Sequence, residues 1–86
     1  MARVRLSTKA RKAFEKLARS NRRLFARVDQ ALDLLSQQPE AGKALHGPLS
    51  GRRPLRVGPA RIIYRYQPEK LVVLVLAITP RDKAYS

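Results

Sequence analysis

Basic residues and tyrosines in the second half of the sequence have the types and spacing needed to act on a phosphate. In ARIIYRYQ, Arg61 and Arg65 share one face of a predicted strand, and both should reach water or a ligand because an unpaired buried charge is costly. The apolar run LVVLVLAI is then followed by a tail that contains Arg81, Lys83 and Tyr85. Because a guanidinium group can bind a phosphate through two hydrogen bonds, this cluster favours a polyanionic ligand.

Further arginines precede this strand at positions 52, 53 and 56. If these segments are neighbouring strands, Arg52, Arg53, Arg56 and Arg61 form a basic face that suits several consecutive phosphates. A tyrosine beside such a face can stack on an unpaired base or transfer a proton. RNA supplies its own nucleophile, the 2′-hydroxyl group, so cleavage there needs no metal ion in principle.

The same residues also permit simpler interpretations. Tyr64 and Tyr66 fall on the strand face of Ile62, which predicts that they belong to the core or its edge. His46 lies in a segment rich in glycine and proline, where a surface histidine is more common than a catalytic base. By itself the cluster therefore indicates nucleic-acid binding, and indicates cleavage only weakly.

Composition narrows the class of protein. The 86 residues form one small domain, 1–86, and the net charge of +13 favours nucleic acid, an anionic membrane surface or an acidic protein as partner. The N-terminus does not resemble a secretory signal, and the longest apolar run is too short to span a membrane, which predicts a cytoplasmic protein without a membrane partner. With no cysteine and one histidine, we expect no metal centre and no cofactor.

Periodicity predicts an α+β fold. An N-terminal strand (3–6) precedes two helices, with Ser7 or Thr8 as the first N-cap, Asn21 as the second, and Pro39 near the end of the second helix. Strands are expected at 55–57, 60–66 and 71–78, joined by turns at 58–59 and 67–70. The helices should form an antiparallel hairpin packed on a twisted antiparallel sheet, with Phe14, Leu17, Phe25, Val28, Leu32 and Leu35 in the core.

The order of these elements resembles the RelE branch of the RelE/ParE toxin superfamily over nearly the whole chain. The specific part runs from Gly51 to Arg65, in the pattern G-x-x-x-L-R-V-G-x-x-R-I-I-Y-R, followed by an apolar strand and the ending from Ile78 to Tyr85. The resemblance implies a RelE-like fold and the toxin of a toxin–antitoxin pair. It also implies a ribosome-dependent, metal-independent endoribonuclease that cuts mRNA in the A site. The implied partners are the ribosome, mRNA and a small acidic antitoxin, with which the toxin forms a hetero-oligomer.

The resemblance also assigns roles to individual residues. Arg61 and Arg81 would stabilise the pentacoordinate phosphorane, and Tyr85 would stack on a base or assist proton transfer. Among the residues expected to bind the substrate, Arg52 also follows from the resemblance, whereas Arg53, Arg56 and Lys83 are assigned from their places in the basic cluster.

Two prolines and one alanine depart from the RelE pattern. Pro54 replaces a strand lysine, Pro80 replaces a histidine found in many relatives, and Ala60 replaces an aromatic residue. These changes bear on proton transfer more than on binding. Two alternatives therefore stay open: a ParE-like inhibitor of DNA gyrase, and a non-catalytic protein of the same fold that binds RNA or an antitoxin.

Overall fold

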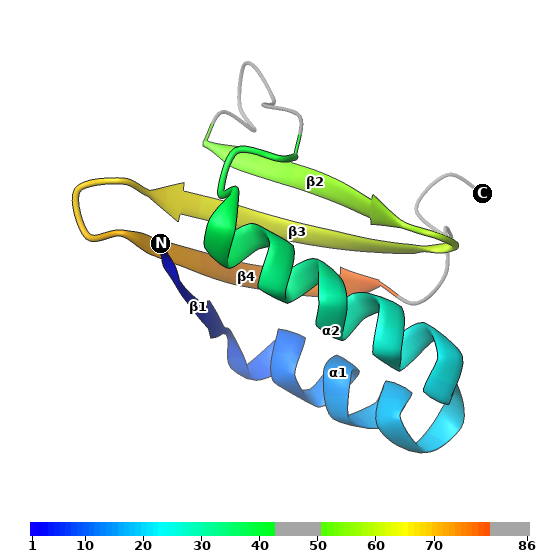
Figure 1. Ribbon diagram of the computed structural model, residues 1–86. Coiled ribbons are helices and arrows are strands. Elements are labelled where there is room, and N and C mark those ends of the chain that lie inside the picture. Colours follow the sequence, from blue (N-terminus) through cyan, green and yellow to red (C-terminus); the bar gives the residue numbers. More distant parts are fainter. Residues whose placement is uncertain (43–50, 80–86) are drawn as a thin grey trace.

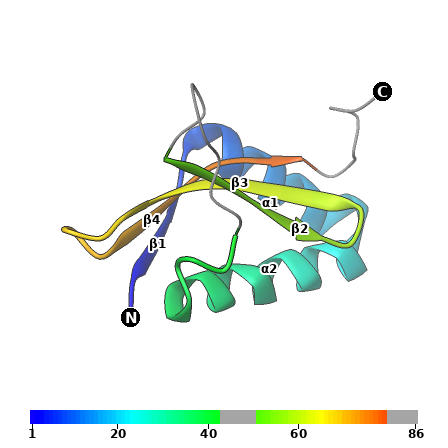
Figure 2. The same ribbon diagram turned by 90° about the horizontal axis from the view of Figure 1, so that it is seen from above.

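The computed structural model describes residues 1–42 and 51–79. Its elements are β1 (Arg3–Leu6), α1 (Thr8–Ser20), α2 (Arg22–Gln37), β2 (Arg52–Val57), β3 (Ala60–Gln67) and β4 (Val72–Thr79) (Figure 1). The strands form one sheet in the order β1-β4-β3-β2, and α1 and α2 pack as a hairpin on one of its faces (Figure 2). The predicted α+β architecture is confirmed.

Polar caps explain why the two helices join so tightly. The Ser7 hydroxyl accepts a hydrogen bond from Ala10 N at 3.1 Å and so caps the start of α1. The Asn21 side chain accepts one from Leu24 N at 3.1 Å, while the Asn21 backbone N–H donates to Leu17 O at 2.9 Å. One residue therefore ends α1 and begins α2, as its position in the sequence predicted. Neither described helix is long and apolar enough to cross a bilayer.

The sheet is antiparallel from β2 to β4, as predicted, and β1 adds a parallel strand that makes the whole sheet mixed. The parallel pairing is fixed by backbone bonds from Arg3 N to Leu71 O and from Ser7 N to Val75 O, at 2.8 and 2.9 Å. Both helices and the two other strands lie between β1 and β4 in the chain. Local periodicity cannot predict a pairing over that separation, so this feature of the sheet had to come from the structure.

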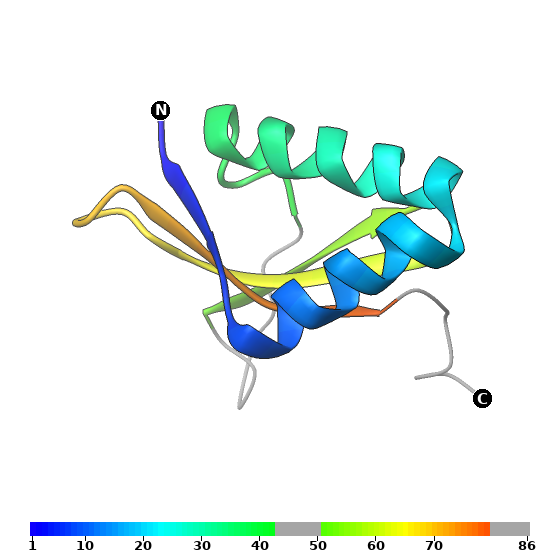
Figure 3. The ribbon, with the colours of Figure 1, turned by 90° about the horizontal axis from the view of Figure 1, so that it is seen from below.

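The core lies between the helix hairpin and the covered face of the sheet. Of the core residues predicted from sequence, Leu17, Val28, Leu32 and Leu35 are buried. Phe14 and Phe25 are only half-buried, and their rings stack with centroids 4.6 Å apart. In Figure 3, which shows the molecule from below, α1 and α2 run side by side, and α2 lies above the strands in that view. The sheet contributes Ile62, Tyr64, Val73 and Val75, each fully buried.

Candidate nucleic-acid interface

The two faces of β3 differ sharply in chemistry. Ile62 and Tyr64 point toward the helices and are fully buried, whereas Arg61, Ile63 and Arg65 alternate with them and point to the uncovered side. We refer to this uncovered side of the sheet as the open face. The predicted division of β3 is confirmed, including the interpretation of Tyr64 as a core residue.

Arginines on the open face lie directly opposite one another. The two-residue turn between β2 and β3 sets a register in which Arg56 is the cross-strand partner of Arg61, and Arg52 that of Arg65. Like charges in directly opposite positions destabilise a sheet, so both pairs oppose folding by their own electrostatics. An anion that binds between the guanidinium groups converts this repulsion into attraction. The register therefore indicates an anion-binding surface.

The neighbouring strands extend the surface. Arg61 is the cross-strand partner of Thr79, the last described residue of β4. Arg65 lies opposite Leu74, and on the far side of Leu74 the register brings Arg5 of β1 to the same face. Arginines of β1, β2 and β3 therefore lie on the open face, and β4 places the apolar side chain of Leu74 between Arg5 and Arg65. The Nε atom of Arg61 is buried, so the part of this side chain nearest the backbone is not exposed to solvent.

The four strands contribute only positive charges to this surface. None of the four strands contains an aspartate or glutamate. Within residues 1–42 and 51–79, no group of three His, Cys, Asp or Glu side chains could hold a metal ion. Cations on strands that carry no carboxylate of their own raise the local concentration of an anionic ligand, so the open face suits a polyphosphate backbone.

The structure brings together only part of the cluster that the sequence suggested. Arg52, Arg56 and Arg61 share the open face. Arg53 lies on the opposite, helix-covered face, where its Nη1 donates to Gly42 O at 2.9 Å. The remaining residues with predicted roles, Arg81, Lys83 and Tyr85, lie outside the described residues, as does His46.

Two arginines of the open face had no site role in the sequence-based prediction. Arg65 was interpreted as solvated or facing a partner, and Arg5 was assigned only to the N-terminal strand. The position of Arg65 opposite Arg52 could have been predicted from the sequence. A two-residue hairpin turn at Gly58–Pro59 fixes every cross-strand partner along β2 and β3. No such signal existed for Arg5, since its place depends on the long-range pairing of β1 with β4.

A buried hydrogen bond beneath the sheet fixes the segment that follows α2. The Tyr64 hydroxyl accepts a bond from Gly42 N at 2.8 Å. A Cβ atom at position 42 would lie 2.7 Å from that hydroxyl and 2.8 Å from Pro54 O, so only glycine permits this approach. Burial raises the pKa of Tyr64, although the bond from Gly42 and the charge of Arg53 act in the opposite direction.

This tyrosine should make stability depend on pH in alkaline solution. The phenol of an unfolded chain ionises near pH 10, whereas the raised pKa keeps Tyr64 protonated in the folded protein. Above about pH 10 the unfolded state therefore binds fewer protons, and the free energy of unfolding should fall as pH rises further. Urea titrations at about pH 8 and about pH 11 measure this fall.

Tyr64→Phe is the matched control for this pH dependence. It leaves the Gly42 N–H without its acceptor, which should cost about 1–3 kcal/mol near pH 7. Other groups that titrate at high pH are common to both proteins, so the alkaline fall should be smaller in the variant. An equal fall in both proteins would contradict the assignment to Tyr64.

The chain matches a known protein family over most of its length. Residues 4–85 match the family described as the ParE toxin of the type II toxin–antitoxin system parDE. No curated protein matches the sequence.

Solved structures show the same fold. The chain is similar to one in the RelBE2 toxin–antitoxin complex from Mycobacterium tuberculosis, at 33% identity, with 93% of this chain and 98% of that chain covered and a TM-score of 0.82. The isolated RelE toxin from E. coli gives 20% identity, coverage of 99% and 92%, and a TM-score of 0.78. A YoeB/ParE toxin from Agrobacterium tumefaciens gives 17% identity, coverage of 90% and 95%, and a TM-score of 0.79. At those lower identities the likeness is one of fold.

Proposed function

Because the chain belongs to the RelE/ParE superfamily of toxins from type II toxin–antitoxin systems, we propose that it is an endoribonuclease that cuts mRNA on the ribosome. The observation that carries this proposal is the pairing of Arg52 with Arg65 and of Arg56 with Arg61 on the open face. Four guanidinium groups on two adjacent strands can hold consecutive phosphates of one RNA strand.

The proposed reaction uses the RNA's own nucleophile. A 2′-hydroxyl group loses its proton and attacks the adjacent phosphorus, while the bond from phosphorus to the 5′-oxygen breaks and that oxygen takes up a proton. The products are a 2′,3′-cyclic phosphate and a 5′-hydroxyl end. Negative charge grows on the phosphoryl oxygens in the transition state, so cations already held in position accelerate the step.

Within this proposal each residue has a distinct role. Arg61 and Arg81 stabilise the pentacoordinate phosphorane, and Tyr85 stacks on a base or assists proton transfer. Arg52 and Arg56 hold flanking phosphates, and Lys83 adds general attraction. Arg53 has no part in the proposal, since its guanidinium group is bound to Gly42 on the helix side.

The proposed partner outside the ribosome is a small acidic antitoxin. The relative at 33% identity was solved as a toxin–antitoxin complex, and a chain with a net charge of +13 suits an acidic segment. Such binding would stabilise the small domain by mass action and form a toxin–antitoxin hetero-oligomer. Because the proposed target is the ribosome, we expect the toxin to act in the cytoplasm and to meet its antitoxin there.

A second candidate function is inhibition of DNA gyrase. The match over residues 4–85 to the family described as the ParE toxin favours it. Gyrase is the target that a resemblance to the ParE branch implies. The arginine pairs of the open face suit a phosphate backbone, whereas gyrase is a protein, and for this reason we rank mRNA cleavage first.

One pair of assays separates the two functions. Primer extension on mRNA from cells that express the chain should reveal new 5′ ends within translated codons. A gyrase supercoiling assay with the purified chain should show no inhibition. Inhibited supercoiling with uncut mRNA would replace the first function by the second, and a negative result in both assays would leave a binding protein on a toxin fold.

A further inference from the structure

A groove lies between α2 and the turn that joins β2 to β3, and Figure 1 shows this turn beside the N-terminal half of α2. Its volume is about 290 Å³, close to the lower limit of about 300 Å³ for small-molecule sites, so it suits one small flat group. One stripe of α2 and the end of the β2–β3 hairpin provide its main lining residues, Arg27, Gln30, Leu34, Leu55, Arg56 and Gly58. We refer to it as the turn groove.

The guanidinium group of Arg27 lies against the β2–β3 turn. A Cβ atom at position 58 would be 2.6 Å from Arg27 Nη1 and 3.1 Å from Cζ, so glycine is the residue that leaves room for this contact. Gly58 also has a φ of 58°, which glycine adopts without strain. Arg27 is nevertheless an exposed residue, so a ligand can reach it. A guanidinium group that is held in place and still accessible can stack on a nucleic-acid base.

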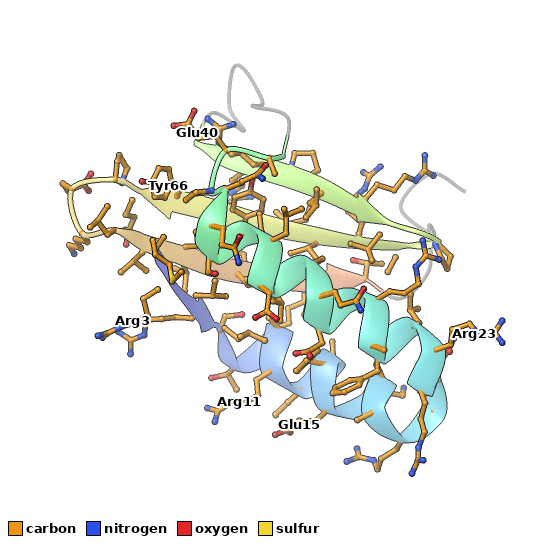
Figure 4. All side chains as sticks on the ribbon, viewed as in Figure 1. Arg3, Arg11, Glu15, Arg23, Glu40 and Tyr66 are labelled. Atoms are coloured by element: carbon orange, nitrogen blue, oxygen red, sulfur yellow. The ribbon has the colours of Figure 1, made fainter. Side chains whose placement is uncertain are left out.

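Arg27 supplies the stacking surface of the turn groove, since none of the residues that line the groove is aromatic. Tyr66, which is only half-buried, lies at the other end of the sheet, far from the hairpin tip marked by Arg23 in Figure 4. A base bound in the groove therefore depends on Arg27 for stacking.

Gln30 adds a group that can distinguish one base from another. It is exposed and follows Arg27 by one helical turn, on the same side of α2. Its amide both donates and accepts hydrogen bonds, and adenine presents a donor and an acceptor side by side that glutamine can bind together. Leu34, which is 38% exposed, and Leu55 supply apolar walls. The groove thus combines a planar cation, an amide and apolar walls, which are the groups that bind a single base.

Arg56 connects the turn groove to the open face. It lines the groove and is also the cross-strand partner of Arg61. A nucleic-acid strand whose phosphates bind this arginine pair therefore passes the entrance of the groove. The carboxylates of α2, at Asp29 and Asp33, do not line the groove, so its lining carries only positive charge.

We propose that the turn groove binds one adenine base of the RNA substrate and that Gln30 determines this specificity. In choosing RNA the inference rests on the proposed function, because phosphates of the same strand would occupy the open face. Arg27 stacks on the base, Gln30 binds its edge, and Arg56 holds the adjacent phosphate.

Binding of three single-stranded RNA hexamers to the intact chain tests this inference. Each hexamer contains adenine, cytosine or uracil alone, so the result does not depend on the register in which it binds. Fluorescence anisotropy at about 50 mM salt gives the dissociation constants. The test variant is Gln30→Ala, and the matched control is Gln37→Ala at the exposed end of the same helix. Arg27→Lys keeps the charge but removes the planar group. Circular dichroism verifies that the variants fold.

The wild-type chain should bind the adenine hexamer at least about 5-fold more tightly than either pyrimidine hexamer. Gln30→Ala should abolish this preference, and Gln37→Ala should retain it. Arg27→Lys should weaken binding of the adenine hexamer about 5-fold, because stacking is lost. A wild-type chain without a preference, or a preference that survives in Gln30→Ala, would overturn the proposal. So would an equal weakening of polyglutamate binding by Arg27→Lys, which would identify an acidic peptide as the occupant.

The assay contains no ribosome and requires no cleavage, so it separates this inference from the proposed function. A chain that cuts mRNA but has no base preference dependent on Gln30 contradicts only the role of the turn groove. Adenine binding that depends on Gln30, without mRNA cleavage, contradicts only the proposed function.

Discussion

Replacing Arg61 by alanine should lower the rate of ribosome-dependent mRNA cleavage about 100- to 1000-fold, because a cation placed beside the reacting phosphate contributes mainly in the transition state. Arg61 lies opposite Arg56 and Thr79, at the end of the sheet from which residues 80–86 continue. Arg81→Ala should have the same effect if both guanidinium groups bind the same phosphate. Binding to ribosomes should survive in each variant, since the other cations remain.

The control for Arg61→Ala is Lys70→Ala, which removes an exposed charge from the β3–β4 turn and should leave the cleavage step nearly unchanged. Arg61→Lys keeps the charge but loses the two-point contact, so an intermediate rate is expected. Single-turnover cleavage of ribosome-bound mRNA gives the rates, and thermal unfolding shows whether each variant is folded. A normal rate in folded Arg61→Ala would remove this residue from the proposed mechanism.

Leu35→Ala should destabilise the protein by about 2–5 kcal/mol, the largest effect that we expect from a single truncation in α2. The Leu35 side chain is fully buried between α2 and the sheet. Its truncation removes apolar contacts and leaves a cavity that the packed surroundings fill only in part. Domains of this size are stable by about 5–15 kcal/mol, so such a loss would remove a large share of the total stability.

The preceding residue provides a matched control on the same helix. Leu34 is 38% exposed, and Leu34→Ala makes the same chemical change at the surface, where an effect within about 0.5 kcal/mol is expected. Urea denaturation of both variants gives the two free energies of unfolding. Similar losses for the two leucines would contradict the packing of α2 against the sheet.

The sequence by itself determined the elements of the fold and one face of the candidate site. Asn21 marks the junction of the helices and Gly58–Pro59 the hairpin turn, since caps and turns depend on a few adjacent residues. The alternation in β3 separated Arg61 and Arg65 from Tyr64, because successive side chains of a strand point to opposite faces. The resemblance of the Gly51–Arg65 pattern to RelE-like toxins was confirmed at the level of the superfamily.

Only the tertiary structure decided features that depend on residues far apart in the chain. The parallel pairing of β1 with β4 brings Arg5 to the open face, where Leu74 of β4 lies between Arg5 and Arg65 of β3. Gly42 contacts Tyr64, which lies 22 residues further along the chain. The residues adjacent to position 42 therefore do not predict that a glycine is required there. Periodicity reports which side chains share a face of one element. Which faces then meet is set by packing and backbone pairing across the whole domain, and this is why the assembly of the site followed from the tertiary structure.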